Sequence, residues 1–168
     1  MIFLDLINLK KLRRAVICVL CIIAALWLQI MVLARVEIAG AKPMLLPGLT
    51  VAFGFWLGGV WGGVLGIVAG LLYDRCCIGP AALYLVLFAA FGFFAGVLAE
   101  YLLNRRFLSF FLLAAAALVV TALCRIIPMW LFHDAALGPL LATGAKETLW
   151  SLPLTAPAYF AAKGISKR

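Results

Sequence analysis

The sequence predicts an all-α integral membrane protein: a bundle of six short transmembrane helices, or five on the alternative count, in one polytopic domain over residues 1–168. Apolar residues make up 68% of the chain and charged residues 12%, whereas a soluble domain is about half apolar and about a quarter charged. The mean hydropathy is +1.22. The net charge of +8 comes from basic residues that lie between apolar blocks, which indicates membrane topology and argues against nucleic-acid binding.

The first expected span covers residues 15–34, because a crossing helix needs about 20 mostly apolar residues. It follows a basic cluster made of Lys10, Lys11, Arg13 and Arg14. The same pattern could be a signal peptide with a cleavage site at Ala39-Gly40-Ala41. We reject that interpretation because the apolar run exceeds the about 7–15 residues of a signal-peptide core, and because further spans follow.

The later spans are expected at residues 43–57, 60–74, 80–103, 107–127 and 144–162. The last contains Pro153 and Pro157, which membrane helices tolerate when neighbours satisfy the freed backbone groups. The difficult stretch is 43–73, because a single helix of this length would extend about 45 Å. Its glycine pairs at 58/59 and 62/63 offer a place to turn, so we predict two spans joined by a hairpin.

Basic residues decide between six and five spans, because they are enriched in cytoplasmic loops. With six spans, one side of the membrane receives nine basic residues, Arg105 and Arg106 among them, and the other side receives five. With five spans, each side receives seven, and the asymmetry vanishes. We therefore predict a multi-pass protein with six spans and both termini on the cytoplasmic side.

A stripe of glycines recurs every four residues in the second and third spans: Gly54, Gly58, Gly62, Gly66 and Gly70. Residues four apart share one face of a helix, and a glycine face lets another helix approach to backbone contact. Two interpretations follow. The stripe packs helices within the chain and permits the turn, or it forms a docking face for a partner helix.

Asp74 follows the stripe at the end of the third span. An unpaired charge near the apolar zone is costly, so this carboxylate is expected to reach the headgroup level or to find a cation. Arg125 lies at the same end of the fifth span on this topology, and we predict a structural pair between the two. A solvated Asp74 at the helix end and an ion-coupling carboxylate are the alternatives.

Groups that could carry catalysis are sparse. Cys18 and Cys21 match the CxxC spacing but lie in an apolar span without further ligands, and the five cysteines give no disulfide framework. The chain has no Gly-x-Ser-x-Gly, His-Glu-x-x-His, phosphate-binding or dinucleotide-binding motif. We therefore predict a protein that is not an enzyme and that has no cofactor and no metal site.

The order of these features resembles the rod shape-determining protein MreD family. The resemblance begins with Lys42-Pro43 at the start of the second span and includes the glycine-rich turn and the segment Gly66-Ile-Val-Ala-Gly-Leu-Leu-Tyr-Asp74. It ends with Ile78-Gly79 leading into Ala81-Ala82-Leu83. The family usually has Leu where this chain has Ile78, and Pro80 is a further departure. Chain length and basic termini agree with the family.

The resemblance implies a non-enzymatic scaffold in the cytoplasmic membrane of a bacterium, within the cell-elongation complex. The implied partner is an MreC-like single-span protein, and through it the actin-like MreB, the glycan polymerase RodA and a class B penicillin-binding transpeptidase. Such a protein would help to organise lateral peptidoglycan synthesis and rod shape. It would also contact membrane lipid, and it would bind no nucleic acid.

The alternative is the substrate-binding membrane subunit of an energy-coupling-factor vitamin transporter, which the chain resembles in size and in its bundle of six short spans. Such subunits usually carry an Ala-x-x-x-Ala face in the first span. Here the alanine pairs at this spacing include Ala95/Ala99 and Ala158/Ala162, in later spans, and the first span has none. A vitamin pocket also needs several convergent polar groups, and the sequence offers few.

Overall fold

The computed structural model describes residues 2–33, 35, 42–76, 83–101, 107–133 and 137–167, and the side chains of these residues except 2–11, 128–133, 137 and 167. Over this part of the chain the structure has no strand and six α-helices: α1 (Ile2–Leu28), α2 (Leu46–Leu57), α3 (Gly59–Cys76), α4 (Leu83–Tyr101), α5 (Phe107–His133) and α6 (Leu137–Lys167). A π-helical segment, η1 (Gln29–Leu33), continues α1. An all-α fold with six helices is therefore confirmed for the described residues.

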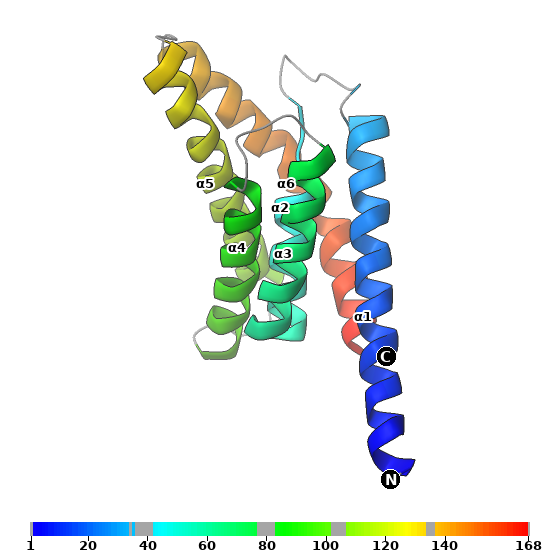
Figure 1. The fold of residues 1–168 in the computed structure, drawn as a ribbon. Helices are drawn as coiled ribbons and strands as arrows, with labels where there is room; N and C mark the ends of the chain where they lie inside the picture. Colours follow the sequence, from blue (N-terminus) through cyan, green and yellow to red (C-terminus); the bar gives the residue numbers. More distant parts are fainter. Residues whose placement is uncertain are drawn as a thin grey trace.

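The helices run back and forth between two ends of the molecule (Figure 1). Both termini and the α2–α3 turn lie toward one end, which we call the terminal end. The end of η1, the start of α2 and the end of α3 lie toward the other, the opposite end. Each helix therefore reverses the direction of the one before it.

Three helical segments are long and apolar enough to cross a membrane: Leu12–Leu33, Leu83–Tyr101 and Phe107–Ile127. Several helices continue past the spans expected from the sequence. α1 begins at Ile2 instead of residue 15, and α6 begins at Leu137 instead of residue 144. Helical backbone hydrogen bonds do not require apolar side chains, so a helix can extend beyond the apolar window from which its span is predicted.

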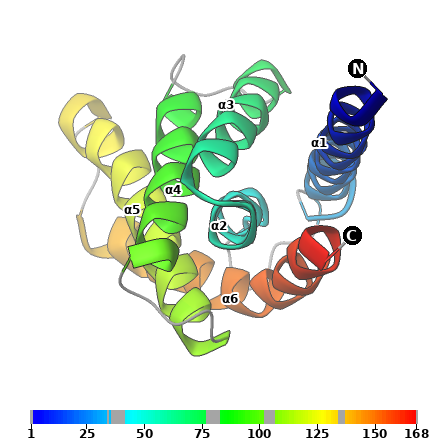
Figure 2. The ribbon, with the colours of Figure 1, turned by 90° about the horizontal axis from the view of Figure 1, so that it is seen from below.

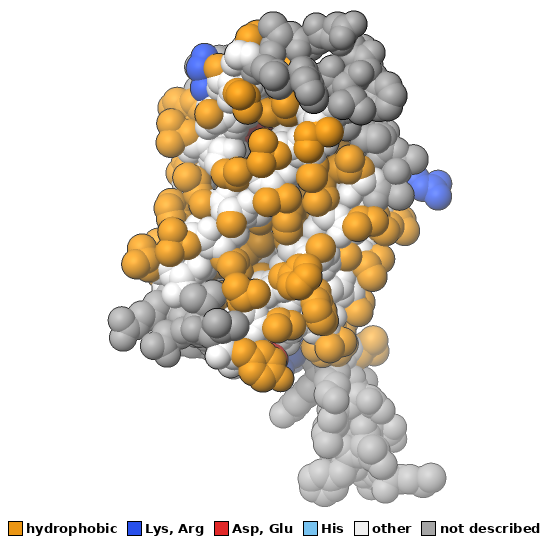
Figure 3. All heavy atoms as spheres, turned by 90° about the vertical axis from the view of Figure 1, so that its left-hand side faces the viewer, with side chains coloured by type: hydrophobic (Ala, Val, Ile, Leu, Met, Phe, Trp, Pro, Cys, Tyr) orange, Lys and Arg blue, Asp and Glu red, His pale blue; other side chains and the backbone are white. Residues whose placement is uncertain are grey.

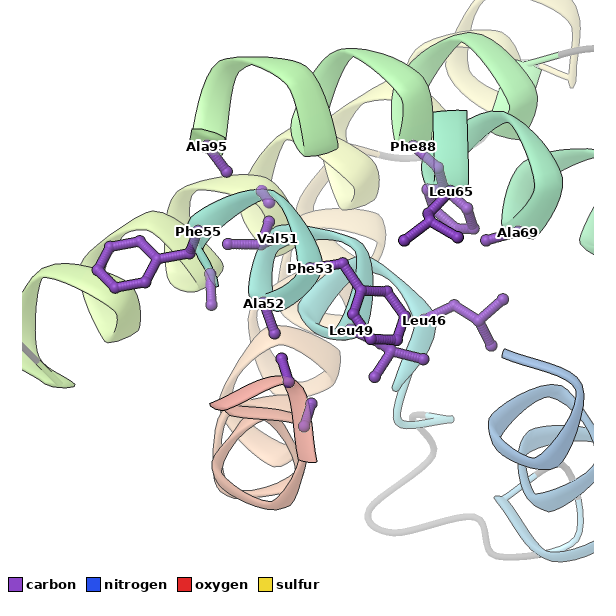
Figure 4. Close-up of a cluster of buried hydrophobic side chains, with 14 of the residues drawn as sticks. Leu46, Leu49, Val51, Ala52, Phe53, Phe55, Leu65, Ala69, Phe88 and Ala95 are labelled. Atoms are coloured by element: carbon purple, nitrogen blue, oxygen red, sulfur yellow. The ribbon is translucent and has the colours of Figure 1, made fainter. Parts of the chain in front are cut away.

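α2 forms the centre of the molecule, and Figure 2 shows it surrounded by the other helices, with α1 set to one side. Every residue from Leu46 to Phe55 is buried. A helix that is apolar on all sides belongs in an interior, which is where this one lies. Phe53 and Phe55 are fully buried, and Figure 4 shows them among side chains from α3 and α4 such as Leu65 and Ala95.

The second expected span, residues 43–57, is only partly helical. Residues 42–45 belong to no helix or strand, and α2 starts at Leu46 with Pro47 in its first turn, where proline costs no helical hydrogen bond. Twelve helical residues rise about 18 Å. The helix by itself is therefore shorter than the roughly 30 Å of a hydrocarbon core.

The outside of the bundle is apolar. α4 and α5 expose large side chains such as Val86, Phe94 and Leu112. On the face formed by these helices, apolar side chains are spread over most of the described surface, and the visible basic side chains lie near its margins (Figure 3). Packing inside the bundle therefore uses only part of the apolar surface of each helix.

Candidate functional site

The glycine stripe is buried between helices of the same chain. A Cβ added to Gly62, Gly66 or Gly70 on α3 would overlap backbone atoms of α4. Gly92 of α4 faces Gly62, and a Cβ on either would collide with the carbonyl oxygen of the other. Gly54 of α2 meets the same Gly92 carbonyl. These glycines therefore pack against helices of the same chain.

Gly58 forms the turn between α2 and α3. Its φ of +95° lies in a region that side chains of L residues rarely adopt. A Cβ here would also lie 2.8 Å from the Glu100 carboxylate Oε1. The expected hairpin therefore occurs at the first glycine of the two pairs, and the chain reverses within a single residue.

Asp74 holds the start of α4. Its Oδ2 accepts a hydrogen bond of 3.1 Å from the backbone N–H of Leu85, in the first turn of α4. Backbone N–H groups at a helix start lack partners within the helix, and the helix dipole favours a negative charge there. The other oxygen, Oδ1, is buried without a hydrogen-bond partner among the described residues. The carboxylate thus joins the end of α3 to the beginning of α4.

Arg125 pairs with Glu147 and not with Asp74. The expected pair between Asp74 and Arg125 is therefore wrong. The Arg125 Nη2 donates to Glu147 Oε2, linking α5 to α6. The Glu147 side chain is 6% exposed and that of Arg125 is 38% exposed. Glu147 was not among the residues predicted from the sequence to form a pair. A carboxylate inside the expected 144–162 span was the available signal, because such groups need a partner.

The non-helical segment before α2, residues 42–45, is held by side chains from two other elements. Ser151 Oγ of α6 accepts a 2.8 Å hydrogen bond from the Met44 N–H and donates to the Glu147 carbonyl. Gln29 Oε1 of η1 accepts hydrogen bonds from the N–H groups of Leu45 and Leu46, at 2.9 and 3.2 Å. These bonds replace those that a helix would have supplied. Neither Gln29 nor Ser151 was predicted from the sequence to make these contacts.

Together these residues form what we call the polar joint: Gln29, Arg125, Glu147 and Ser151, around the segment 42–46. It lies between η1, α2, α5 and α6. Ser151 is fully buried and Gln29 is 7% exposed. Its chemistry is that of hydrogen bonding and one ion pair in apolar surroundings. The described residues contain no group of three His, Cys, Asp or Glu side chains placed to bind a metal ion.

The basic residues expected to set the topology are only partly described. Arg13 and Arg14 are exposed on α1, and Arg14 borders a cavity with Ser166 near the terminal end. Lys163 of α6 adds a cation there, with its Nζ 5.7 Å from the centre of the Trp56 ring. The others lie outside the described side chains: Lys10, Lys11, Arg105 and Arg106.

Comparison with known proteins gives no relative. No protein-family model, no curated protein and no solved structure matches this chain. Function must therefore be argued from the residues and the geometry described above.

Proposed function

We propose that the chain is an integral membrane protein with six crossings and both termini in the cytoplasm. Three helical segments have the length and apolarity of a span. The six helices alternate in direction between the two ends (Figure 1), and the face in Figure 3 is apolar between its margins. In this orientation the more basic side of the membrane is the one that holds the termini, in agreement with the positive-inside rule.

Within that membrane the chain serves as a non-enzymatic scaffold of the MreD type. The observation that carries the proposal is that residues of the resemblance are structural joints. Pro43 belongs to the non-helical segment before α2, Gly66 and Gly70 pack α3 closely against α4, and Asp74 holds the start of α4. A scaffold needs a bundle that keeps its shape, and these joints supply it.

The partner in this proposal is an MreC-like single-span protein. The five glycines are already covered by α2, α3 and α4, so the partner helix would contact the apolar outer surface. In lipid, association of helices depends on close packing and hydrogen bonds, since lipid tails are as apolar as the helices. Through the partner, the chain would help to position MreB, RodA and a class B transpeptidase for lateral wall synthesis.

Depletion and rescue test the proposal. In a rod-shaped bacterium that depends on this chain, depletion should give rounded or wide cells, and a tagged copy should restore rods. The tagged chain should co-purify with the MreC-like protein. Gly164→Ala is a suitable control variant, because a Cβ at this position meets nothing within 4 Å and should leave rescue unchanged.

Two outcomes would contradict the scaffold proposal. One is normal rod shape after depletion. The other is recovery of the tagged chain with a pair of ABC-type ATPases, which would favour the energy-coupling-factor alternative.

A further inference from the structure

A cavity of about 190 Å³ lies beside the polar joint. Its lining includes Gln29, Leu33, Lys42, Met44, Tyr73 and Arg125. These residues come from η1, the segment before α2, α3 and α5, so the cavity forms where four parts of the chain meet. It lies toward the opposite end, away from both termini.

Gln29 presents hydrogen-bond donors to this cavity. Its Oε1 accepts from the N–H groups of Leu45 and Leu46, which fixes the orientation of the amide. The Nε2 then carries two N–H donors, and it has no hydrogen-bond partner among the described residues. Gln29 is more than nine-tenths buried and lines the cavity. A ligand or water in the cavity can supply the acceptor that these donors lack.

The backbone at this position is also unusual. Gln29 is the first residue of the π-helical segment η1. Single π-helical turns are rare, and they occur frequently at functional sites because they change the direction of a side chain.

Basic side chains form part of the cavity lining. Lys42 and Arg125 line it, and no acidic residue is among the described lining residues. Arg125 directs Nη2 to Glu147, yet its side chain is 38% exposed. A guanidinium has five N–H donors, and its planar geometry suits a carboxylate. Arg125 can therefore hold Glu147 and still donate to a ligand.

The remaining lining is apolar and limits the ligand to a small size. Leu33, Pro43 and Met44 are buried side chains on the cavity wall. Drug-sized ligands occupy cavities of about 300–1,000 Å³, and this cavity is smaller. Its apolar wall favours a compact carbon skeleton over a bare inorganic anion.

We propose that this cavity binds a small organic carboxylate, with Gln29 Nε2 and Arg125 as donors to the carboxylate and with the apolar wall around its carbon skeleton. The site faces the non-cytoplasmic side in the proposed orientation. It is independent of the scaffold role, since it follows from the cavity and its lining.

Binding of benzoate to the purified full-length chain in detergent tests the proposal, with benzamide as the uncharged analogue of the same shape. Titration calorimetry should show saturable binding of benzoate and at least tenfold weaker binding of benzamide. Inorganic phosphate should also bind at least tenfold more weakly, because it lacks a carbon skeleton. Added phosphatidylglycerol should leave benzoate binding unchanged.

Gln29→Glu is the informative variant. It keeps an oxygen to accept from Leu45 and Leu46, but it replaces the amide donors with a negative charge. Benzoate affinity should fall at least tenfold, measured on variant protein that elutes at the same position as the parent in size-exclusion chromatography. Arg75→Gln is the matched control, because it removes an exposed cation at the same end of α3 without touching the cavity lining.

Several results would overturn the proposal. Equal binding of benzoate and benzamide would contradict a carboxylate site. Equal affinity in the parent and Gln29→Glu would contradict it as well. Equal affinity for inorganic phosphate would make it a site for simple anions. Competition by phosphatidylglycerol would assign the cavity to a lipid headgroup.

Discussion

At the residue scale, glycines allow the closest contacts between helices. Gly62 and Gly92 bring α3 and α4 so close that each faces the carbonyl of the other. Contacts this close allow Cα–H to carbonyl interactions and dense van der Waals packing, which hold helices together where water supplies no driving force. The contribution of each glycine to stability therefore depends on the atoms that lie opposite it.

Two alanine substitutions should separate packed from open glycines. Gly66→Ala forces its methyl into the α4 backbone and should lower the unfolding free energy by about 1–3 kcal/mol. Gly164→Ala has open space and should raise it slightly or leave it unchanged, because alanine favours a helix by about 0.5–1 kcal/mol. Thermal unfolding of the two purified variants measures the difference. Equal midpoints would show that the contact at Gly66 is not tight.

Removing one partner of the ion pair between α5 and α6 should destabilise the protein more than removing both. Arg125→Met leaves a buried carboxylate on Glu147 without its cation and should cost about 3–5 kcal/mol. Combining it with Glu147→Leu should recover part of that loss, because two apolar side chains need no partner. Unfolding midpoints of the parent, both single variants and the double variant form the test. Additive effects would mean that the two side chains do not interact.

Which charged side chains pair with each other could not be predicted from the sequence. Asp74, Arg125 and Glu147 are all visible as charges within or beside apolar segments. Which carboxylate meets Arg125 depends on how α3, α5 and α6 are rotated and tilted, and a hydropathy pattern does not record rotation. The need for a partner was predictable, and its identity was not.

At the scale of elements, α2 and α3 form a hairpin with almost no loop. The reversal uses Gly58 alone, between helices that end at Leu57 and begin at Gly59. The hairpin could be predicted because glycine pairs interrupt an apolar run of awkward length. The non-helical segment before α2 could not, because the apolar residues Pro43 to Leu46 have the same hydropathy inside and outside a helix.

Gly58→Ala should weaken this hairpin. Alanine at a positive φ costs about 1–2 kcal/mol, and its methyl would approach the Glu100 carboxylate. The variant should unfold at a lower temperature than the parent. Gly138→Ala is the control, since the added methyl meets nothing within 4 Å. Equal stability of the two variants would argue against a positive φ at Gly58.

At the scale of the whole molecule, six helices could be predicted and their arrangement could not. Apolar windows of sufficient length and the glycine turn gave the number of helices. Figure 2 shows α2 in the centre and α1 to one side. This arrangement depends on which helix surfaces are complementary in shape. Single-sequence patterns do not record that complementarity. The polar joint is built from residues more than a hundred positions apart, so it could not be predicted either.

Accessibility of introduced cysteines should report the orientation of the whole bundle. In a variant without the five native cysteines, Arg75→Cys lies at the opposite end and Lys163→Cys near the terminal end. An impermeant maleimide added to intact spheroplasts should label Arg75→Cys only. After permeabilisation both should react. Labelling of both before permeabilisation, or of Lys163→Cys alone, would contradict six crossings with cytoplasmic termini.

The hydrogen bond between Met44 and Ser151 also has a consequence for biosynthesis. The two residues lie 107 positions apart, and Ser151 belongs to the last helix. During synthesis, Gln29 precedes the segment 42–45 and can accept from Leu45 and Leu46 at once. The Met44 N–H must wait until α6 has been made. The start of α2 is therefore completed last, and a nascent chain without α6 would expose an unsatisfied backbone group that quality-control proteases could recognise.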